Sequence, residues 1–425
     1  MSDTIFALSS GAPPAAIGVI RISGDKAGSV LRALLGRKLE PRRPSLTKLH
    51  GADGEVLDEA LVLWFPGPKT ATGEDLAELH CHGGRAVVAA IEAELASHAG
   101  LRHAEPGEFT RRAFANGRID LAEAEGLADL LSAETELQRG AAMAMAGGHF
   151  SKQIELWRDT LLRLAAEVEA ALDFSDEDDV SGLSADFPVR LAGLAEELAD
   201  WLSRPRSERL GEGYRVVLAG PPNAGKSTLF NALIESEAAI TSSIAGTTRD
   251  VIERSVSIDG IPFTFIDTAG LHDGGDDEIE SIGIDRARGQ LESADLVLWL
   301  GPEQEARDEF WQVEAQIDIL TQMVKSDPVW RVSAKTGEGL HDLKHAIVAR
   351  ARAAMPRPGE VALNARQHSR LDESYSGLCD ARITQDPLIV AECLRRARVA
   401  FDRLIGRATT EDMLDALFGR FCIGK

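Results

Sequence analysis

Short runs of alternating apolar and polar residues dominate the first part of the chain. The segment IGVIRIS, residues 17–23, alternates like a strand with one buried face. ALVLWFPGP, residues 60–68, is an apolar run closed by a Pro-Gly-Pro turn. From Ile119 to Leu137, apolar residues instead recur near helical spacing. We therefore predict a mixed α+β domain over residues 1–118, followed by helices.

Two helical regions flank a segment of a different pattern. Apolar stripes at helical spacing run through residues 154–172 and 187–202, and the chain from 356 to 425 is again helical in pattern. Between them, strands, a glycine-rich loop and helices follow one another, as in an α/β domain. We expect an α/β domain at 211–355, inserted into one helical bundle built from residues 119–210 and 356–425.

Composition and charge restrict the class of protein. The chain has 425 residues and a formal net charge of −22, which argues against a protein that coats nucleic acid. An RNA contact would then need a partner or a local basic surface, for which RRAFANGR (residues 111–118) is the candidate. The sequence contains no membrane-spanning apolar run, signal-peptide pattern or C-x-x-C pair. These features predict a cytoplasmic protein with reduced cysteines and no membrane association.

A phosphate-binding loop opens the central domain. GPPNAGKS, residues 220–227, follows a strand-like run and precedes a helical one, which disfavours a glycine turn without a ligand. Lys226 is expected to contact the β- and γ-phosphates, and the Ser227 hydroxyl to ligate Mg²⁺. The residues predicted to contact nucleotide here are Asn223, Ala224, Gly225, Lys226, Ser227 and Thr228.

Three further motifs follow in the order that a Ras-like GTPase requires. IAGTTRD, residues 244–250, offers Thr248 as a second Mg²⁺ ligand. SVSIDGIPFTFIDTAG reads as a hairpin with an Asp-Gly turn, and it ends in Asp267 and Gly270, which would sense the metal and the γ-phosphate. The motif predicted to lie beside the base is Ser333, Ala334 and Lys335. Together the motifs predict GTP as the ligand.

The guanine-reading motif departs from the usual Asn/Thr-Lys-x-Asp. We assign it to VKSD, residues 324–327, in which Asp327 would accept from the base and Lys325 would cover the ring. An apolar residue, Val324, stands where a side chain usually supports the loop, so looser nucleotide binding is expected.

These motifs and several others resemble the MnmE (TrmE) family of bacterial tRNA-modification GTPases over the whole chain. The segments that carry the resemblance are DTIFALSS, TGEDLAELHCHGG, PGEFTRRAFANGRIDLAEAEGL, GPPNAGKSTLFNAL, IAGTTRD, SAKTGEGL and the terminal FCIGK. The resemblance implies an N-terminal folate-binding domain that forms a homodimer, a helical domain and an inserted GTPase domain. It also implies an FAD-containing partner, MnmG, with which the family adds an aminomethyl-type group to C5 of the tRNA wobble uridine.

The resemblance also assigns a folate site. Arg21, Glu78, Arg118 and Lys425 match positions that contact a tetrahydrofolate derivative, either 5-formyl or 5,10-methylene. We expect Phe421 and Ile423 to anchor the tail so that Cys422 and Lys425 reach this pocket. Cys422 is then either catalytic or a buried structural thiol.

Hydrolysis in the family uses no glutamine and no arginine finger. By alignment Glu280 would orient the attacking water, with Asp276, Asp277 and Glu278 as competitors. Lys226 and Thr248 complete the predicted catalytic set. A K⁺ ion that is bound when two GTPase domains pair would supply positive charge; its predicted ligands are Asn223, Ser242, Ile244 and Thr247.

Other interpretations stay open at this stage. The chain could be an RNA- or ribosome-associated assembly GTPase without modification chemistry, or a scaffold with a degraded nucleotide site. The folate motifs argue against the first, and Lys226, Ser227, Thr248 and Asp267 against the second. LHCHGG, residues 79–84, suggests a metal site only weakly, because no third or fourth ligand is evident.

Overall fold

A computed structural model describes residues 3–173, 183–235, 238–239, 252–268, 289–291, 293–302, 310–319, 330–407 and 411–425. The chain forms two compact units, residues 1–128 with 399–425 and residues 129–398. The α+β, helical and inserted α/β parts of the predicted fold are confirmed. Among the described helices, none is long and apolar enough to cross a membrane.

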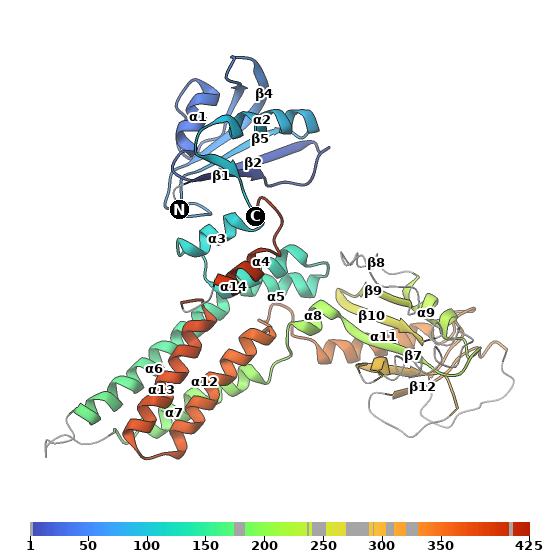
Figure 1. Cartoon of the computed structure of the whole chain (residues 1–425). Coiled ribbons are helices and arrows are strands. Elements are labelled where there is room, and N and C mark those ends of the chain that lie inside the picture. Colours follow the sequence, from blue (N-terminus) through green and yellow to red (C-terminus); the bar gives the residue numbers. More distant parts are fainter. Residues whose placement is uncertain are drawn as a thin grey trace, which may run out of the picture. The chain divides into compact units, whose positions relative to one another are not determined.

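The first unit is built on a six-stranded sheet in the order β3-β4-β5-β2-β1-β6 (Figure 1). Apolar side chains on one sheet face, including Phe6, Ile20 and Leu79, pack with Leu31 of α1 and Ile91 of α2. The alternation in IGVIRIS places Arg21 on the opposite face, since neighbouring strand residues point to opposite sides. The elements are β1 (Thr4–Leu8), β2 (Ile17–Ser23), α1 (Ala27–Leu35), β3 (Ser45–His50), β4 (Val56–Phe65), β5 (Leu76–His82), α2 (Arg85–Ser97), β6 (Leu101–His103), α3 (Glu108–Ala115), α4 (Leu121–Ser132) and α14 (Glu411–Phe418).

The helical part of the second unit contains α5 (Glu136–Ala146), α6 (His149–Asp173), α7 (Phe187–Leu202), α8 (Glu208–Glu212), α12 (Ala365–Ile383) and α13 (Pro387–Leu404). Figure 1 shows α6, α7, α12 and α13 side by side, so helices from both flanking segments pack together as predicted. The apolar pattern from Ile119 to Leu137 is divided between α4 and α5, whereas the sequence suggested one helix. Thr135 causes the break, because it caps α5 through a capping box with Gln138.

The α/β part of the second unit is a seven-stranded sheet in the order β13-β12-β11-β7-β10-β9-β8. The predicted Asp-Gly hairpin is confirmed, because β9 and β10 pair antiparallel around Asp259 and Gly260, both at positive φ. The strands are β7 (Tyr214–Ala219), β8 (Ala238–Ala239), β9 (Ile252–Ile258), β10 (Ile261–Asp267), β11 (Leu296–Trp299), β12 (Phe310–Glu314) and β13 (Trp330–Arg331), with helices α9 (Lys226–Ile234) and α11 (Leu340–Ala354).

Candidate functional site

The phosphate-loop motif forms the turn between β7 and α9. Gly220 and Gly225 both have positive φ, and a Cβ on Gly220 would lie 2.9 Å from the Gly301 nitrogen, so this turn needs glycine. Asn223, also at positive φ, is exposed before the helix. Ser227 and Thr228 are exposed on the first turn of α9. The free N–H groups of a helix start favour an anion there.

Lys226 is held across this turn. Its side chain is buried, with 4% exposure, and Nζ donates to the carbonyl oxygens of Gly220 (2.8 Å) and Pro221 (2.9 Å). Burial lowers the pKa of Lys226, and the nearby Asp267 carboxylate partly opposes that shift. A buried ammonium in a glycine loop is suited to bind phosphate oxygens.

Asp267 ends β10 directly beside this loop. It is fully buried and pairs in register with Leu218 of the parallel strand β7. The next residue, Thr268, donates its hydroxyl to the Leu218 carbonyl at 2.9 Å and so fixes the strand end. The structure thus brings Asp267 and Lys226 to the same edge of the sheet.

A second carboxylate, which sequence reasoning missed, lies at the predicted base-side motif. The buried Ser333 hydroxyl donates to Asp318 Oδ1 at 2.8 Å and accepts from the Thr336 N–H at 3.1 Å. Asp318 is exposed in the turn after β12, and Ala334 and Lys335 continue the turn after Ser333. An exposed carboxylate that a buried hydroxyl orients can accept two hydrogen bonds from a planar base.

Gln316 connects the Asp318 turn with the phosphate loop. Its backbone has φ 61°, and its Nε2 donates to the Asn223 carbonyl at 3.5 Å. A Cβ on Gly225 would lie 3.0 Å from the same Nε2. In AQID, residues 315–318, Gln316 stands two residues before the aspartate, where Asn/Thr-Lys-x-Asp has its lysine. The signal that could have found Asp318 is its position after a strand; VKSD keeps the lysine of the usual motif, whereas AQID does not.

Several predicted site residues lie outside the described residues. They are Ser242, Ile244, Thr247, Thr248, Gly270, Asp276, Asp277, Glu278, Glu280, Lys325 and Asp327.

In the first unit, Arg21 and Glu78 lie opposite each other on β2 and β5. Arg21 Nη2 and Glu78 Oε1 are 2.9 Å apart, and the side chains are 24% and 17% exposed. His80 Nε2 lies 3.3 Å from Glu78 Oε2, and the Arg21 guanidinium lies 5.8 Å from the Phe109 ring centre. This partly exposed pair offers donors and acceptors to a polar heterocycle.

Arg118 serves a different contact. Its Nε donates to the Thr70 carbonyl at 3.0 Å, and Asn116 donates to the Thr72 carbonyl at 2.7 Å. These bonds hold the loop before β5, so Arg118 is not paired with Arg21 and Glu78 directly.

The C-terminal tail docks on the first unit (Figure 1). Phe421 is buried beside Phe418, and the Gly107 N–H donates to the Cys422 carbonyl at 3.4 Å. The predicted Ile423 anchor is wrong for its side chain, which is 58% exposed because the residue docks through a backbone bridge to Pro106. Cys422 is exposed, so the buried structural interpretation of this thiol is wrong, and Lys425 is half-buried.

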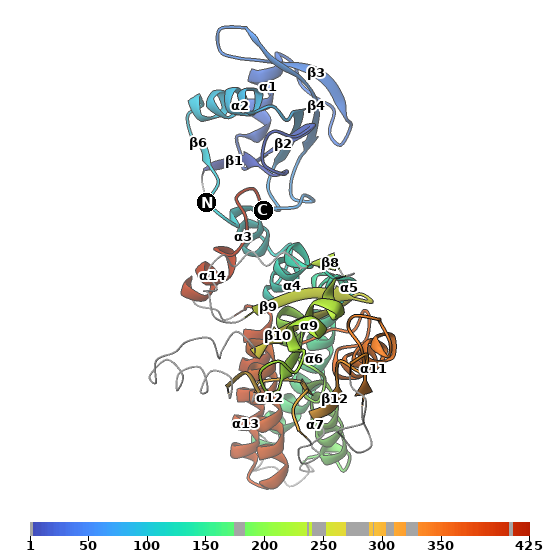
Figure 2. The same ribbon diagram turned by 90° about the vertical axis from the view of Figure 1, so that its right-hand side faces the viewer.

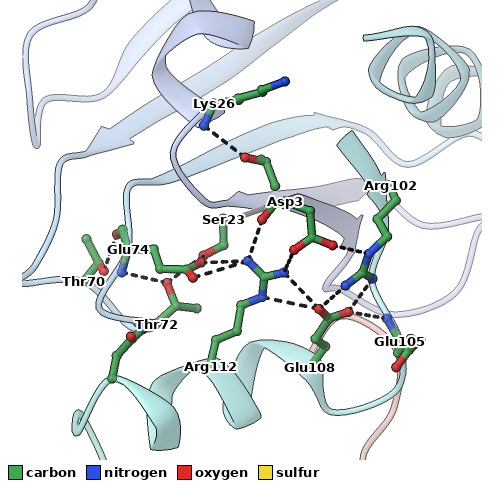
Figure 3. Close-up of polar contacts among 12 residues, drawn as sticks. Asp3, Ser23, Lys26, Thr70, Thr72, Glu74, Arg102, Glu105, Glu108 and Arg112 are labelled. Atoms are coloured by element: carbon green, nitrogen blue, oxygen red, sulfur yellow. Dashed lines mark hydrogen bonds and ion pairs between the residues drawn. The ribbon is translucent and has the colours of Figure 1, made fainter. Parts of the chain in front are cut away.

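RRAFANGR does not form the suggested basic surface. Arg112 is 1% exposed and pairs with Asp3, Glu74 and Glu108 (Figure 3). Arg111 pairs with the α14 residues Glu411 and Asp415, at 2.5 and 2.7 Å. Arg112 is therefore neutralised inside the protein, whereas Arg111 pairs at the surface with carboxylates that are 78% and 61% exposed.

The Cys81 and His82 side chains of LHCHGG have other partners in the structure. Burial raises the pKa of Cys81 to about 11, and its thiol donates to the Gly18 carbonyl at 3.2 Å. His82 pairs with Asp58 at 2.7 Å. No cluster of three or more metal-ligating side chains occurs in the part of the chain that the structure describes.

Comparison with known proteins gives matches over the whole chain. Residues 4–118 match the family model "GTP-binding protein TrmE N-terminus", and residues 121–422 match "MnmE helical domain". The tRNA modification GTPase MnmE of Erythrobacter litoralis is 64% identical over 100% of both chains. That of Zymomonas mobilis is 50% identical over 99% of this chain and 100% of its own.

Solved structures give partial matches. The G domain of the T. maritima FeoB iron transporter is 30% identical and covers 32% of this chain and 98% of its own, with a TM-score of 0.24. Aquifex aeolicus Era bound to GDP and AlF4⁻ is 22% identical over 41% of this chain and 68% of its own, with a TM-score of 0.26.

Proposed function

Because the chain belongs to the MnmE family of tRNA modification GTPases, we propose that its GTP hydrolysis drives modification of C5 of the tRNA wobble uridine. The product would carry an aminomethyl or carboxymethylaminomethyl group whose carbon comes from a tetrahydrofolate derivative. The proposed partners are a second copy of the chain, the FAD-containing MnmG subunit and tRNA.

The observation that carries the GTPase part is buried Lys226 in its glycine loop, beside Asp267. Lys226 and the N–H groups of the loop would bind the phosphates. Ser227 and Asp267 supply the hard oxygen donors that Mg²⁺ prefers, and Mg²⁺ would supply positive charge on the phosphate oxygens. We assign the reading of guanine to Asp318, held by Ser333, in place of the Asp327 that the sequence suggested.

The proposed binding site of the folate heterocycle is the Arg21–Glu78 pair. Glu78 can accept from the pterin amino group and ring N–H, while Arg21 and the tail residue Lys425 can hold carboxylates. Arg118 would position the edge of this site, because it holds the loop before β5 through the Thr70 carbonyl. Cys422, exposed on the docked tail, is proposed as the catalytic thiol.

The same sheet face supports the proposed homodimer. Leu46, Leu61, His80 and Val19 align across β3, β4, β5 and β2, so they share a face with Arg21 and Glu78. Leu46 and Leu61 are 67% and 39% exposed, and Ile17 is 59% exposed. Exposed apolar side chains on one face are typical of a protein interface.

The K⁺-dependent pairing of GTPase domains and the role of Glu280 remain part of the proposal. Of the four proposed K⁺ ligands, Asn223 lies within the described residues; it is exposed in the phosphate loop, and its amide oxygen would suit that ion.

Mass spectrometry of wobble uridines tests the function. We expect the modified nucleosides to disappear in cells that lack the gene and to return with the unsubstituted chain, but not with Lys226→Ala. A modification profile unchanged by the deletion would favour the assembly-GTPase alternative.

A further inference from the structure

One segment of the first unit, residues 32–48, has a charge opposite to that of the whole chain. Residues 32–48 contain six basic side chains and a single acidic one, Glu40, in a chain of net charge −22. We call the basic side chains of this segment the basic patch; they are Arg32, Arg37, Lys38, Arg42, Arg43 and Lys48.

All six basic side chains are exposed. Arg43 pairs with Glu40 at 2.7 Å, but these side chains are 74% and 71% exposed, so the pair is weak and easily exchanged for another anion. Within the described residues, no ion pair involves Arg32, Arg37, Lys38 or Lys48. Most of the charge is therefore available to a ligand.

The backbone holds the patch in a fixed shape. Leu39 is buried in the core, and Pro41 and Pro44 restrict the loop on either side of the two arginines. Arg42 has φ 61°, an uncommon conformation for a non-glycine residue, and its N–H donates to the Trp64 carbonyl at 2.8 Å. Its guanidinium lies 5.7 Å from the Phe65 ring centre. A preordered basic loop loses less entropy when it binds.

Apart from Lys48, the patch lies on α1 and in the loop before β3, and α1 packs on the sheet face opposite to Arg21 and Glu78. Lys48, two residues from Leu46 on β3, shares the face of that pair. Both ribbon views place α1, and Figure 2 also places β3, at the end of the first unit away from the C-terminus; these two elements flank the loop (Figures 1 and 2). An extended polyanion could contact the patch while a distant part of it reaches the tail.

We propose that the basic patch binds the phosphate backbone of tRNA. Arginine forks and lysine ammonium groups donate to phosphate oxygens without reading the sequence, which suits an enzyme that handles several tRNAs. The choice of RNA over another polyanion rests on the proposed function. The patch replaces RRAFANGR as the RNA contact on this chain.

The test is tRNA binding by the full-length protein, measured by filter binding from 50 to 300 mM salt. The variants are Arg37→Glu/Lys38→Glu and Arg42→Glu/Arg43→Glu. The control is Lys152→Glu/Arg352→Glu, which makes the same change of net charge at exposed side chains of the second unit. Phosphate release from GTP is measured in parallel.

We expect each patch variant to weaken binding by about tenfold or more and to lower the salt slope by about 1 per contacting side chain. The control and the GTPase rate should stay close to those of the unsubstituted protein. Three results would each overturn the proposal. The control could weaken tRNA binding as much as the patch variants do, the patch variants could leave tRNA binding unchanged, or the unsubstituted protein could fail to bind tRNA. Patch-dependent binding to phosphatidylserine vesicles without binding to tRNA would also overturn it. The wobble-uridine assay is independent of these outcomes, so the proposed function can stand if the patch fails.

Discussion

At the scale of single residues, the proposed base site depends on the Asp318 carboxylate and the Ser333 hydroxyl that orients it. Ser333 donates to one oxygen of Asp318, which leaves the other acceptor positions for guanine N1–H and N2–H₂. Gln316 stands where a lysine is usual, so the ring would be covered by a neutral amide. Specificity should survive this change better than affinity, because a wrong base leaves the carboxylate unpaired.

We predict that Asp318→Asn weakens GTP binding by about 100-fold and favours xanthosine triphosphate, whose C2 carbonyl accepts from the new amide. Asp327→Asn, the matched control at the position that the sequence suggested, should leave both affinities nearly unchanged. Competition binding with GTP, xanthosine triphosphate and ATP measures this. The reverse pattern, with the switch at Asp327, would return the reading of guanine to VKSD.

At the scale of elements, α3 joins the sheet, the chain start and the tail. Its Arg112 is buried among carboxylates of the chain start, the loop before β5 and α3 itself, and its Arg111 holds α14 (Figure 3). Burial raises the pKa of Glu108, but hydrogen bonds from Arg102, the Glu105 N–H and Arg112 outweigh it, so the pKa is lowered. The charged carboxylate therefore stabilises the folded unit.

Glu108→Gln tests this contribution. A lowered folded-state pKa gives stability that is present above the ordinary pKa of glutamate, about 4.3, and is lost as the pH falls through the folded value. We expect the substitution to cost about 3–5 kcal/mol at pH 7, because it leaves the buried Arg112 and the partly exposed Arg102 underpaired. The difference from the unsubstituted protein should shrink in acid. Denaturant unfolding at pH 7 and pH 4 measures it. A pH-independent difference would show that packing alone is affected.

The tail is an element whose docking depends on a glycine. Gly424 has φ +93°, and a Cβ there would lie 2.2 Å from the Leu8 carbonyl oxygen. We predict that Gly424→Ala displaces Cys422 and Lys425, so tRNA modification falls at least about tenfold while GTP hydrolysis persists.

Gly54→Ala is the matched control. Gly54 also has positive φ, +84°, but nothing lies within 4 Å of an added Cβ, so only backbone strain is introduced. Nucleoside mass spectrometry and phosphate release are measured for both variants. Full modification by Gly424→Ala would remove the tail from the reaction.

At the scale of the whole molecule, the sequence predicts well where local patterns decide the structure. The alternation in IGVIRIS, the Asp-Gly hairpin and the glycine loop each specify their own geometry, and all three are found. Contacts between distant segments were less predictable. Asp318 meets Ser333 only when β12 and β13 pair, and Arg111 is neutralised by α14, which is 300 residues further along the chain. No local pattern reports such neighbours, so the sequence alone points neither to the Asp318–Ser333 contact nor to the pairing of Arg111 with α14.

The last prediction concerns pairing of whole GTPase domains. The sequence has no glutamine after DTAG and no recognisable arginine finger, so positive charge for the transition state must come from elsewhere. Asn223 is exposed in the phosphate loop and offers an amide oxygen, while buried Lys226 is proposed to bind the phosphates. If K⁺ bound at a paired interface supplies the charge, turnover should be at least about tenfold faster in K⁺ than in Na⁺. Specific activity should also rise with protein concentration only in K⁺, because pairing is bimolecular.

Asn223→Ala should abolish the difference between the salts while leaving GTP affinity nearly intact, since the loop N–H groups and Lys226 remain. Steady-state phosphate release in matched KCl and NaCl over a range of protein concentrations decides it. Equal rates in the two salts would refute the mechanism, and a K⁺ effect that survives Asn223→Ala would move the ion to other ligands.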